Sequence, residues 1–308
     1  MSDDEIKILQ ERLKNNPNDY DAIEQYAVKL SDIGENEESL KNFLFLNKKI
    51  PDNPKIIYNI GIILEKLKYF QKAAEAYEKS LSLDSNNTDT MYNLASVYIK
   101  LDKLDLSEKL LLKVIEKDKN DENAFFNLGE VYSRKKEHEK AIQYLTKALE
   151  LDPKDIIAKF YLAYEYDKIN RTETAIKLYE EVIQQNPDYS WAYFNLASIF
   201  LSQGNEELAI SNLENTIKTN PGDLQAVKLL VKILAKNKKY TSAEKILKQY
   251  TVKMPEEADL YYLLAQVYKE LKNHPNYLKY LKYTLRRKLK FSGNIIKLEE
   301  EIKNAENK

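Results

Sequence analysis

Asparagine recurs in this 308-residue chain at a fixed interval, and its side chain suits the binding of another polypeptide. Asn59, Asn93 and Asn127 are spaced by 34 residues, and Asn195 follows two intervals later. An asparagine amide offers N–H donors and a carbonyl acceptor, the complements of an extended peptide backbone. Equal spacing would set the amides in a row on repeated elements. The residues therefore indicate either recognition of a peptide backbone or a solvated polar surface.

The residue types that most enzymes and metal sites need are scarce. The chain has no cysteine, which excludes disulfides, thiolate metal ligands and a thiol nucleophile. His138 and His274 lie four intervals of 34 residues apart, and we expect both to be solvated turn residues. The six glycines form no phosphate-binding string. We therefore expect no catalytic residue, no metal site, no cofactor and no enzymatic activity.

Proline marks the elements that position the asparagines. A proline ends a helix and moves the preceding residue out of helical geometry, so regularly spaced prolines separate helical segments. Six of the eight prolines lie on the 34-residue lattice: Pro17, Pro51, Pro153, Pro187, Pro221 and Pro255. When each repeat is numbered from the third residue after the lattice point, eight repeats follow without insertion. They are residues 20–53, 54–87, 88–121, 122–155, 156–189, 190–223, 224–257 and 258–289.

Four columns of this numbering indicate that each repeat is a helical hairpin. Positions 7 and 11 are large and apolar, whereas positions 8 and 20 are small in nearly every repeat. Two antiparallel helices approach closely only where their side chains are short, with larger side chains filling the space around that contact. Position 8 reads Ala27, Gly61, Ala95, Gly129, Ala163, Ala197, Val231 and Ala265.

Two segments carry a family resemblance. Residues 124–132, Ala-Phe-Phe-Asn-Leu-Gly-Glu-Val-Tyr, and residues 141–153, Ala-Ile-Gln-Tyr-Leu-Thr-Lys-Ala-Leu-Glu-Leu-Asp-Pro, resemble tetratricopeptide repeats. The resemblance implies an all-α, right-handed superhelical solenoid of antiparallel helical hairpins. It also implies that the first helix of each hairpin lines a concave groove that binds extended peptides. The family has no single biological role, so the partner stays open.

The segments that flank the repeats are expected to cap them, because a terminal hairpin exposes an apolar face. Residues 1–19 have apolar residues at helical spacing and predict an N-terminal capping helix. Residues 290–308 predict a C-terminal capping helix that begins after Gly293. Its expected apolar stripe is Ile295, Ile296, Leu298 and Ile302, and its expected water-facing residues are Glu299, Glu300 and Glu301.

Two further features accompany the asparagines in the predicted groove. Trp191, the only tryptophan, falls at position 2 of the sixth repeat and suits an anchor in the groove; its alternative is contact with the turn at Pro187. Position 13 puts positive charge along one groove edge, which would favour an acidic peptide. These cations are Lys66, Lys100, Arg134 and Lys168.

Charge is uneven along the chain although the total is −1. Residues 1–40 hold eleven acidic and four basic residues, whereas residues 269–290 hold one acidic and eight basic residues. A basic patch is expected from Lys228, Lys232, Lys236, Arg286 and Arg287. The readings are solvated ends, head-to-tail self-association into a homo-oligomer, or contact with RNA. We rank nucleic acid below protein because base-stacking chemistry is not evident there.

The start of the chain lacks the basic and apolar segments of a secretion signal, and no apolar stretch reaches bilayer length. A cytoplasmic protein without membrane insertion is therefore expected. The residues together predict a non-enzymatic interaction scaffold that binds an extended or acidic segment of another protein.

Overall fold

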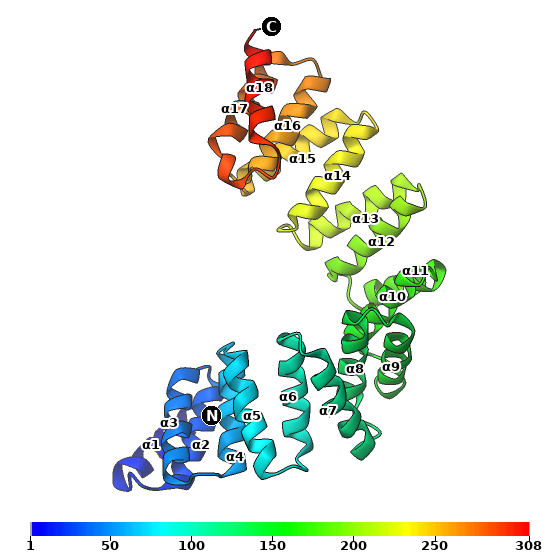
Figure 1. Cartoon of the computed structure of the whole chain (residues 1–308). Coiled ribbons are helices and arrows are strands. Elements are labelled where there is room, and N and C mark those ends of the chain that lie inside the picture. Colours follow the sequence, from blue (N-terminus) through cyan, green and yellow to red (C-terminus); the bar gives the residue numbers. More distant parts are fainter. Residues whose placement is uncertain (1, 308) are drawn as a thin grey trace. The chain divides into compact units, whose positions relative to one another are not determined.

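The computed structural model describes residues 2–307, which fold into α-helices and one short 3₁₀ helix without a strand among them (Figure 1). The helices are α1 (Ser2–Asn15), α2 (Tyr20–Asp32), α3 (Asn36–Lys49), α4 (Pro54–Lys66), α5 (Phe70–Leu83), α6 (Thr88–Lys100), α7 (Leu104–Lys117), α8 (Glu122–Arg134), α9 (His138–Leu151), α10 (Ile156–Lys168), α11 (Thr172–Gln185), α12 (Ser190–Ser202), α13 (Glu206–Thr219), α14 (Leu224–Lys236), α15 (Tyr240–Lys253), α16 (Ala258–Glu270), α17 (His274–Arg286), η1 (Lys288–Lys290) and α18 (Ile295–Glu306). The all-α prediction is confirmed.

The helix boundaries repeat with the 34-residue period. First helices fill positions 1 to 13, and second helices begin at position 17. An Asp or Asn directly before most first helices caps the new helix, as where Asp121 Oδ1 accepts from Ala124 N at 2.8 Å. Between the two helices, position 15 has a left-handed backbone in every repeat, with φ of 88° at Gly34 and 62° at Lys68. This residue turns the chain back to form the hairpin.

The small columns lie where the paired helices approach most closely. Ser39 Oγ at position 20 donates to the carbonyl oxygen of Ala27 at position 8, at 2.6 Å. A Cβ added to Gly61, also at position 8, would lie 2.5 Å from the ring of Tyr77. At Gly61 even a Cβ would require the ring of Tyr77 to move.

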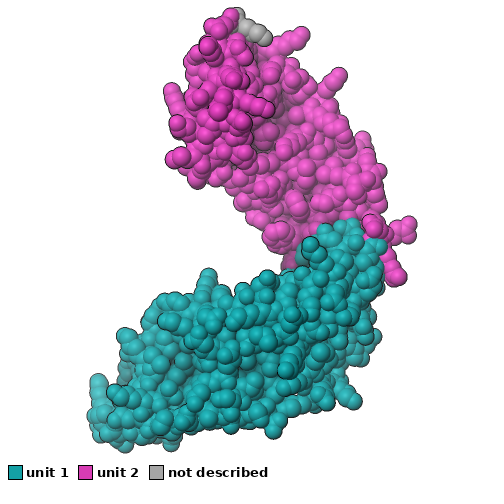
Figure 2. Space-filling model, viewed as in Figure 1, with its two compact units in different colours: residues 1–169 teal, residues 170–308 magenta. Residues whose placement is uncertain are grey.

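The chain forms two compact units, residues 1–169 and residues 170–308 (Figure 2). Unit 1 contains α1 to α10 and unit 2 contains α11 to α18. Within each unit consecutive helices pack together, and neighbouring first helices also touch, as α4 touches α6 and α14 touches α16. Both units are therefore helical repeat solenoids. Among the described helices, none is both long and apolar enough to cross a membrane.

The helices at the two ends keep the repeat register. α1 covers positions 17 to 30 of a preceding repeat, as a second helix does, and α18 starts at position 4 of a following one. Leu298 and Ile302 of α18 fall at positions 7 and 11 and are buried, as these positions are elsewhere. Two expectations for α18 are wrong. Ile296 is 68% exposed because its position faces away from α16 and α17, and Glu301 packs inward onto hydroxyl and amide donors instead of facing water.

Candidate functional site

The asparagines of position 6 lie on successive first helices of unit 1. Asn59 is on α4, Asn93 on α6 and Asn127 on α8. Asn59 and Asn93 are half-buried, whereas Asn127 is only 7% exposed. Regular packing of first helix on first helix thus produces the row of amides that the spacing predicts.

Part of the amide chemistry serves contacts between repeats. Asn93 Nδ2 donates to the hydroxyl of Tyr58, at position 5 of the preceding repeat, at 2.8 Å. Asn127 has the same relation to Tyr92, although its buried Nδ2 makes no hydrogen bond of ordinary geometry. Burial raises the pKa of Tyr58 and of Tyr92, so both hydroxyls stay protonated. One amide N–H of Asn93 is therefore committed to the fold, and its carbonyl and second N–H remain for a ligand.

Asn195 and Trp191 lie together on α12 in unit 2. Asn195 Nδ2 donates to the backbone carbonyl of Trp191 at 2.8 Å, one turn earlier on the same helix. The indole of Trp191 is 59% exposed. An exposed tryptophan beside a partly exposed amide provides one apolar and one polar contact for a ligand.

The position-13 cations contact the neighbouring structure. The contacts are Lys66 Nζ with Ser31 Oγ at 2.6 Å, Lys100 Nζ with Glu65 at 2.6 Å, Arg134 with Glu130 at 2.8 Å and Lys168 Nζ over the ring of Tyr164 at 4.5 Å. Lys100 and Arg134 are thus paired with carboxylates, whereas Lys66 and Lys168 are held by neutral groups. The edge carries less unbalanced positive charge than the residue types suggest.

The residues of the basic patch lie at different places in unit 2. Lys228 binds the carboxylate of Asp259, which also accepts from Ser292 N at 2.9 Å. Burial alone would raise the pKa of Asp259, but Lys228 and Ser292 outweigh it and hold that pKa below its ordinary value. On the same helix as Lys228, Lys232 is exposed and Lys236 pairs with Glu206.

The two arginines of the patch lie at the end of α17. Arg287 donates to the carbonyl oxygens of Pro255 and Tyr283, and its guanidinium lies 4.4 Å from the centroid of the Tyr261 ring. Arg286 is exposed and lies 5.6 Å from the centroid of Tyr283. The donors of Arg287 are therefore largely used within the fold.

The prediction that His138 is a solvated turn residue is wrong. Its Nδ1 lies 2.7 Å from Oε2 of Glu165, a fully buried carboxylate that also accepts from Ser133 Oγ. The imidazole is drawn inward because a buried carboxylate needs donors. Serine and imidazole flank the carboxylate without bonding to each other, so the group lacks the serine–base contact of a nucleophilic site.

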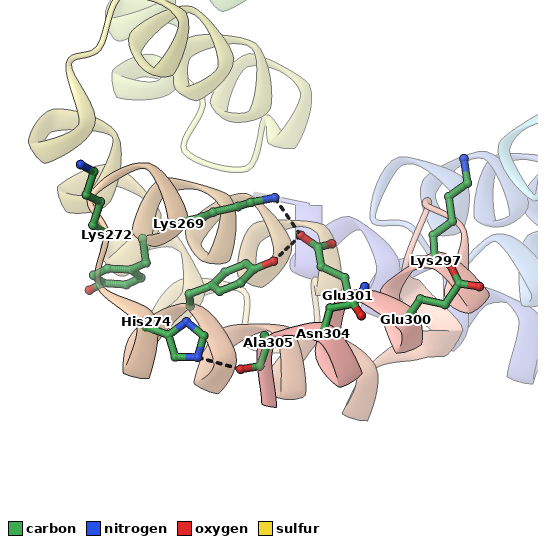
Figure 3. Close-up of a pocket in the computed structure, with 10 residues that line it drawn as sticks. Lys269, Lys272, His274, Lys297, Glu300, Glu301, Asn304 and Ala305 are labelled. Atoms are coloured by element: carbon green, nitrogen blue, oxygen red, sulfur yellow. Dashed lines mark hydrogen bonds and ion pairs between the residues drawn. The ribbon is translucent and has the colours of Figure 1, made fainter. Parts of the chain in front are cut away.

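His274 is also held by the fold, at the edge of a cavity of about 500 Å³ between α16, α17 and α18 (Figure 3). Its Nε2 lies 2.7 Å from the carbonyl oxygen of Ala305. Glu301 accepts from the hydroxyl of Tyr277 at 2.6 Å and lies 3.6 Å from Lys269 Nζ. Lys272 and Lys297 lie at opposite ends of the group of lining residues (Figure 3). No three metal-ligating side chains converge among the described residues.

Comparisons with known proteins agree with this geometry. Tetratricopeptide-repeat models match residues 54–87, 178–211 and 200–267. The model described as the tetratricopeptide repeat protein 21 C-terminal ARM domain matches residues 89–191. No curated protein sequence matches the chain.

Several solved structures share the fold. MamA 41-end from Desulfovibrio magneticus RS-1 is 23% identical, with a TM-score of 0.53 over 56% of this chain and 97% of that one. PilF of Pseudomonas aeruginosa is 18% identical, with a TM-score of 0.59 over 69% and 97%. YrrB is 21% identical, with a TM-score of 0.50 over 61% and 96%. With repeat models matched along both units and helix bounds that follow the 34-residue period, the chain belongs to the tetratricopeptide-repeat proteins.

Proposed function

We propose that this protein is a non-enzymatic scaffold that binds an extended segment of another protein along the asparagine row of unit 1. The observation that carries the proposal is the row itself, with Asn59, Asn93 and Asn127 on three successive first helices. An extended backbone offers alternating donors and acceptors, and an amide can bond to either. YrrB, described as a TPR protein with an unusual peptide-binding site, supports peptide binding on this fold.

Neighbouring side chains would add selectivity. Trp191 supplies an exposed aromatic anchor for a segment bound at unit 2. Lys66 and Lys168, bonded to neutral groups, can pair with acidic side chains of a segment bound at unit 1. The expected ligand is an extended segment with scattered acidic residues.

The affinity of a short segment is expected to be modest. Three amide contacts of about 1 kcal/mol each give about 3 kcal/mol, which corresponds to a Kd weaker than about 1 mM. Ordering a flexible segment reduces this further. Tight binding therefore needs several repeats engaged at once or a folded partner.

The test is affinity capture from source-cell lysate with identification of the bound proteins by mass spectrometry. The native chain is compared with a variant carrying Asn59→Ala, Asn93→Ala and Asn127→Ala. The matched control carries Asn42→Ala and Asn212→Ala, because both asparagines are partly exposed and lie on second helices, outside the row. A partner captured by the native chain and the control but lost from the row variant supports the proposal. Equal capture by all three proteins rejects the row as the binding surface.

The alternative readings have less support. RNA binding at the basic patch would need free cations, and Lys228, Lys236 and Arg287 are engaged in contacts within unit 2. Steep salt dependence of binding to single-stranded RNA would favour that reading. Head-to-tail self-association would appear as a mass that rises with protein concentration.

A further inference from the structure

A cavity of about 730 Å³ opens between α1, α2 and α4, at the place where a first helix would pair with α1. α1 has the register of a second helix, yet no helix within residues 2–169 takes the partner place. We call this cavity the open seat, and its lining includes Glu5, Ile8, Leu9, Asp21 and Val28. The cavity therefore lies beside α1 and α2, where the first helix of a preceding repeat would pack.

The floor of the open seat is apolar. Leu9 is 7% exposed, whereas Ile8 and Val28 are 64% and 39% exposed. Ile8 and Val28 would lose contact with water if a helix filled the seat, and burial of such apolar side chains favours binding. The floor suits the apolar face of an amphipathic helix.

Among the described residues, one carboxylate on the rim of the open seat pairs with no cation. The three cations of the rim are each bound to an acid: Arg12 to Asp19 at 2.8 Å, Lys29 to Glu5 at 2.7 Å and Lys55 to Glu24 at 2.7 Å. Asp21 remains, exposed at position 2 of α2. A cation is therefore the complementary group for a ligand at this rim.

Repeat geometry identifies which residue of a seated helix would face Asp21. Position 2 of one first helix faces position 5 of the preceding first helix, as in the pair Lys55 with Glu24. The same relation with the charges exchanged joins Asp259 and Lys228 in unit 2. A basic residue at position 5 of a seated helix would therefore bind Asp21 as Lys228 binds Asp259.

A second copy of this chain does not supply that helix. α18 has a first-helix register, but its position 5 is Ile296 and its position 8 is Glu299. Position 8 packs on position 20 in a hairpin, and position 20 of α1 is Glu5. Two carboxylates would then meet at the closest helix contact, where every repeat has a small or apolar residue at position 8.

We propose that the open seat binds a basic amphipathic helix of a partner protein, which completes the first hairpin with α1. Its apolar face covers Ile8 and Val28, and its position-5 cation binds Asp21. This inference differs from the proposed function in its ligand, which is a seated helix instead of an extended segment, although Asn59 of the asparagine row also lines the open seat.

The probe is a synthetic fluorescent peptide with the sequence of α14, Leu-Gln-Ala-Val-Lys-Leu-Leu-Val-Lys-Ile-Leu-Ala-Lys. α14 is a first helix with Lys228 at position 5, so it has the pattern that the open seat requires. Fluorescence anisotropy measures its binding to the full chain and to the variants Ile8→Glu and Asp21→Lys. Glu207→Lys is the matched control for charge, because Glu207 is exposed on α13. A second peptide carries Lys228→Glu, and circular dichroism verifies that each variant is folded.

The native chain and the control are expected to bind the first peptide, and each seat variant is expected to bind it about tenfold more weakly. The charge-reversed peptide should prefer Asp21→Lys over the native chain, which a nonspecific apolar contact would not produce. Absence of binding to the native chain, equal binding to folded seat variants, or no reversal of preference overturns the proposal. Sedimentation velocity supplies a further test: self-association of the native chain that Ile8→Glu abolishes would assign the seat to a second copy and also overturn it.

Discussion

Replacing His138 with alanine should destabilise unit 1 strongly, although His138 begins a second helix near the surface. Its imidazole lies 2.7 Å from Glu165, whose side chain is fully buried. In His138→Ala, the carboxylate keeps its hydrogen bond from Ser133 Oγ. Leaving a buried polar group short of a hydrogen-bond partner costs about 1–3 kcal/mol, and about 2–4 °C per kcal/mol for a unit of this size gives a loss of about 2–12 °C in Tm.

A second substitution distinguishes the loss of a hydrogen-bond partner to Glu165 from a simple packing defect. Position 10, which Glu165 occupies, is Ile or Val in six of the eight repeats. Glu165→Ile removes the charge and supplies the usual side chain, so the double variant His138→Ala with Glu165→Ile should unfold within about 1 kcal/mol of the native chain. Glu165→Ile alone should cost about 1 kcal/mol, because His138 is partly exposed and can turn to water.

Urea unfolding followed by circular dichroism measures the four proteins, and hydrogen exchange in α8, α9 and α10 locates the change. The local measurement matters because repeat arrays need not unfold in one step. The reasoning is refuted if His138→Ala changes the free energy of unfolding by less than about 0.5 kcal/mol. It is equally refuted if the double variant loses the sum of the two single effects, since that would mean no coupling.

Three further outcomes follow from the repeat geometry. Burial alone would raise the pKa of Glu301, but its hydrogen-bond donors outweigh burial and hold the pKa in the folded protein below its ordinary value of 4.5. Ionised Glu301 therefore stabilises the fold fully above pH 4.5, and this contribution is lost as the pH falls through the pKa of the folded protein. Glu301→Gln should therefore flatten the acid dependence of hydrogen exchange in α18. Lys136 has a φ of 60°, and Lys136→Gly should raise the free energy of unfolding in urea by about 0.5 kcal/mol. Gly61→Ala should lower it by about 1–3 kcal/mol because the new Cβ would meet Tyr77, with Gly222→Ala as a control that has no such clash.

The helices could be predicted from the sequence because their determinants recur inside each repeat. The small residue at position 8 and the capping residue before position 1 act over a few residues, and eight copies average out local exceptions. Tyr189 and Glu257 stand where other repeats have Asp or Asn and make no side-chain cap, yet α12 and α16 begin at the same position. Packing against neighbouring hairpins replaces the missing cap there.

The state of the candidate site could not be predicted from single repeats, because its contacts run between them. Asn93 reaches Tyr58 and Lys100 reaches Glu65, and both pairs are separated by 35 residues. Lys66 and Ser31 have the same separation. Reading the sequence at this offset would have paired Lys66 and Lys100 with position 12 of the preceding repeat. Arg134 and Lys168 contact Glu130 and Tyr164 four residues earlier on their own helices, so this column of cations is not a column of free charge.

Contacts between adjacent repeats also explain the positions of the two histidines, His138 and His274. Position 10 carries glutamate in the fifth repeat, Glu165, and again in α18, Glu301. In both cases the preceding repeat has histidine at position 17, His138 and His274. A carboxylate in a column that is otherwise mostly apolar must be stabilised from the adjoining hairpin, since a solenoid repeat touches only its neighbours. His138 does this directly, whereas His274 holds the backbone of α18 while Tyr277 binds the carboxylate. The polar exceptions in a repeat are therefore informative as pairs, one in each of two adjacent repeats, rather than as single candidate residues.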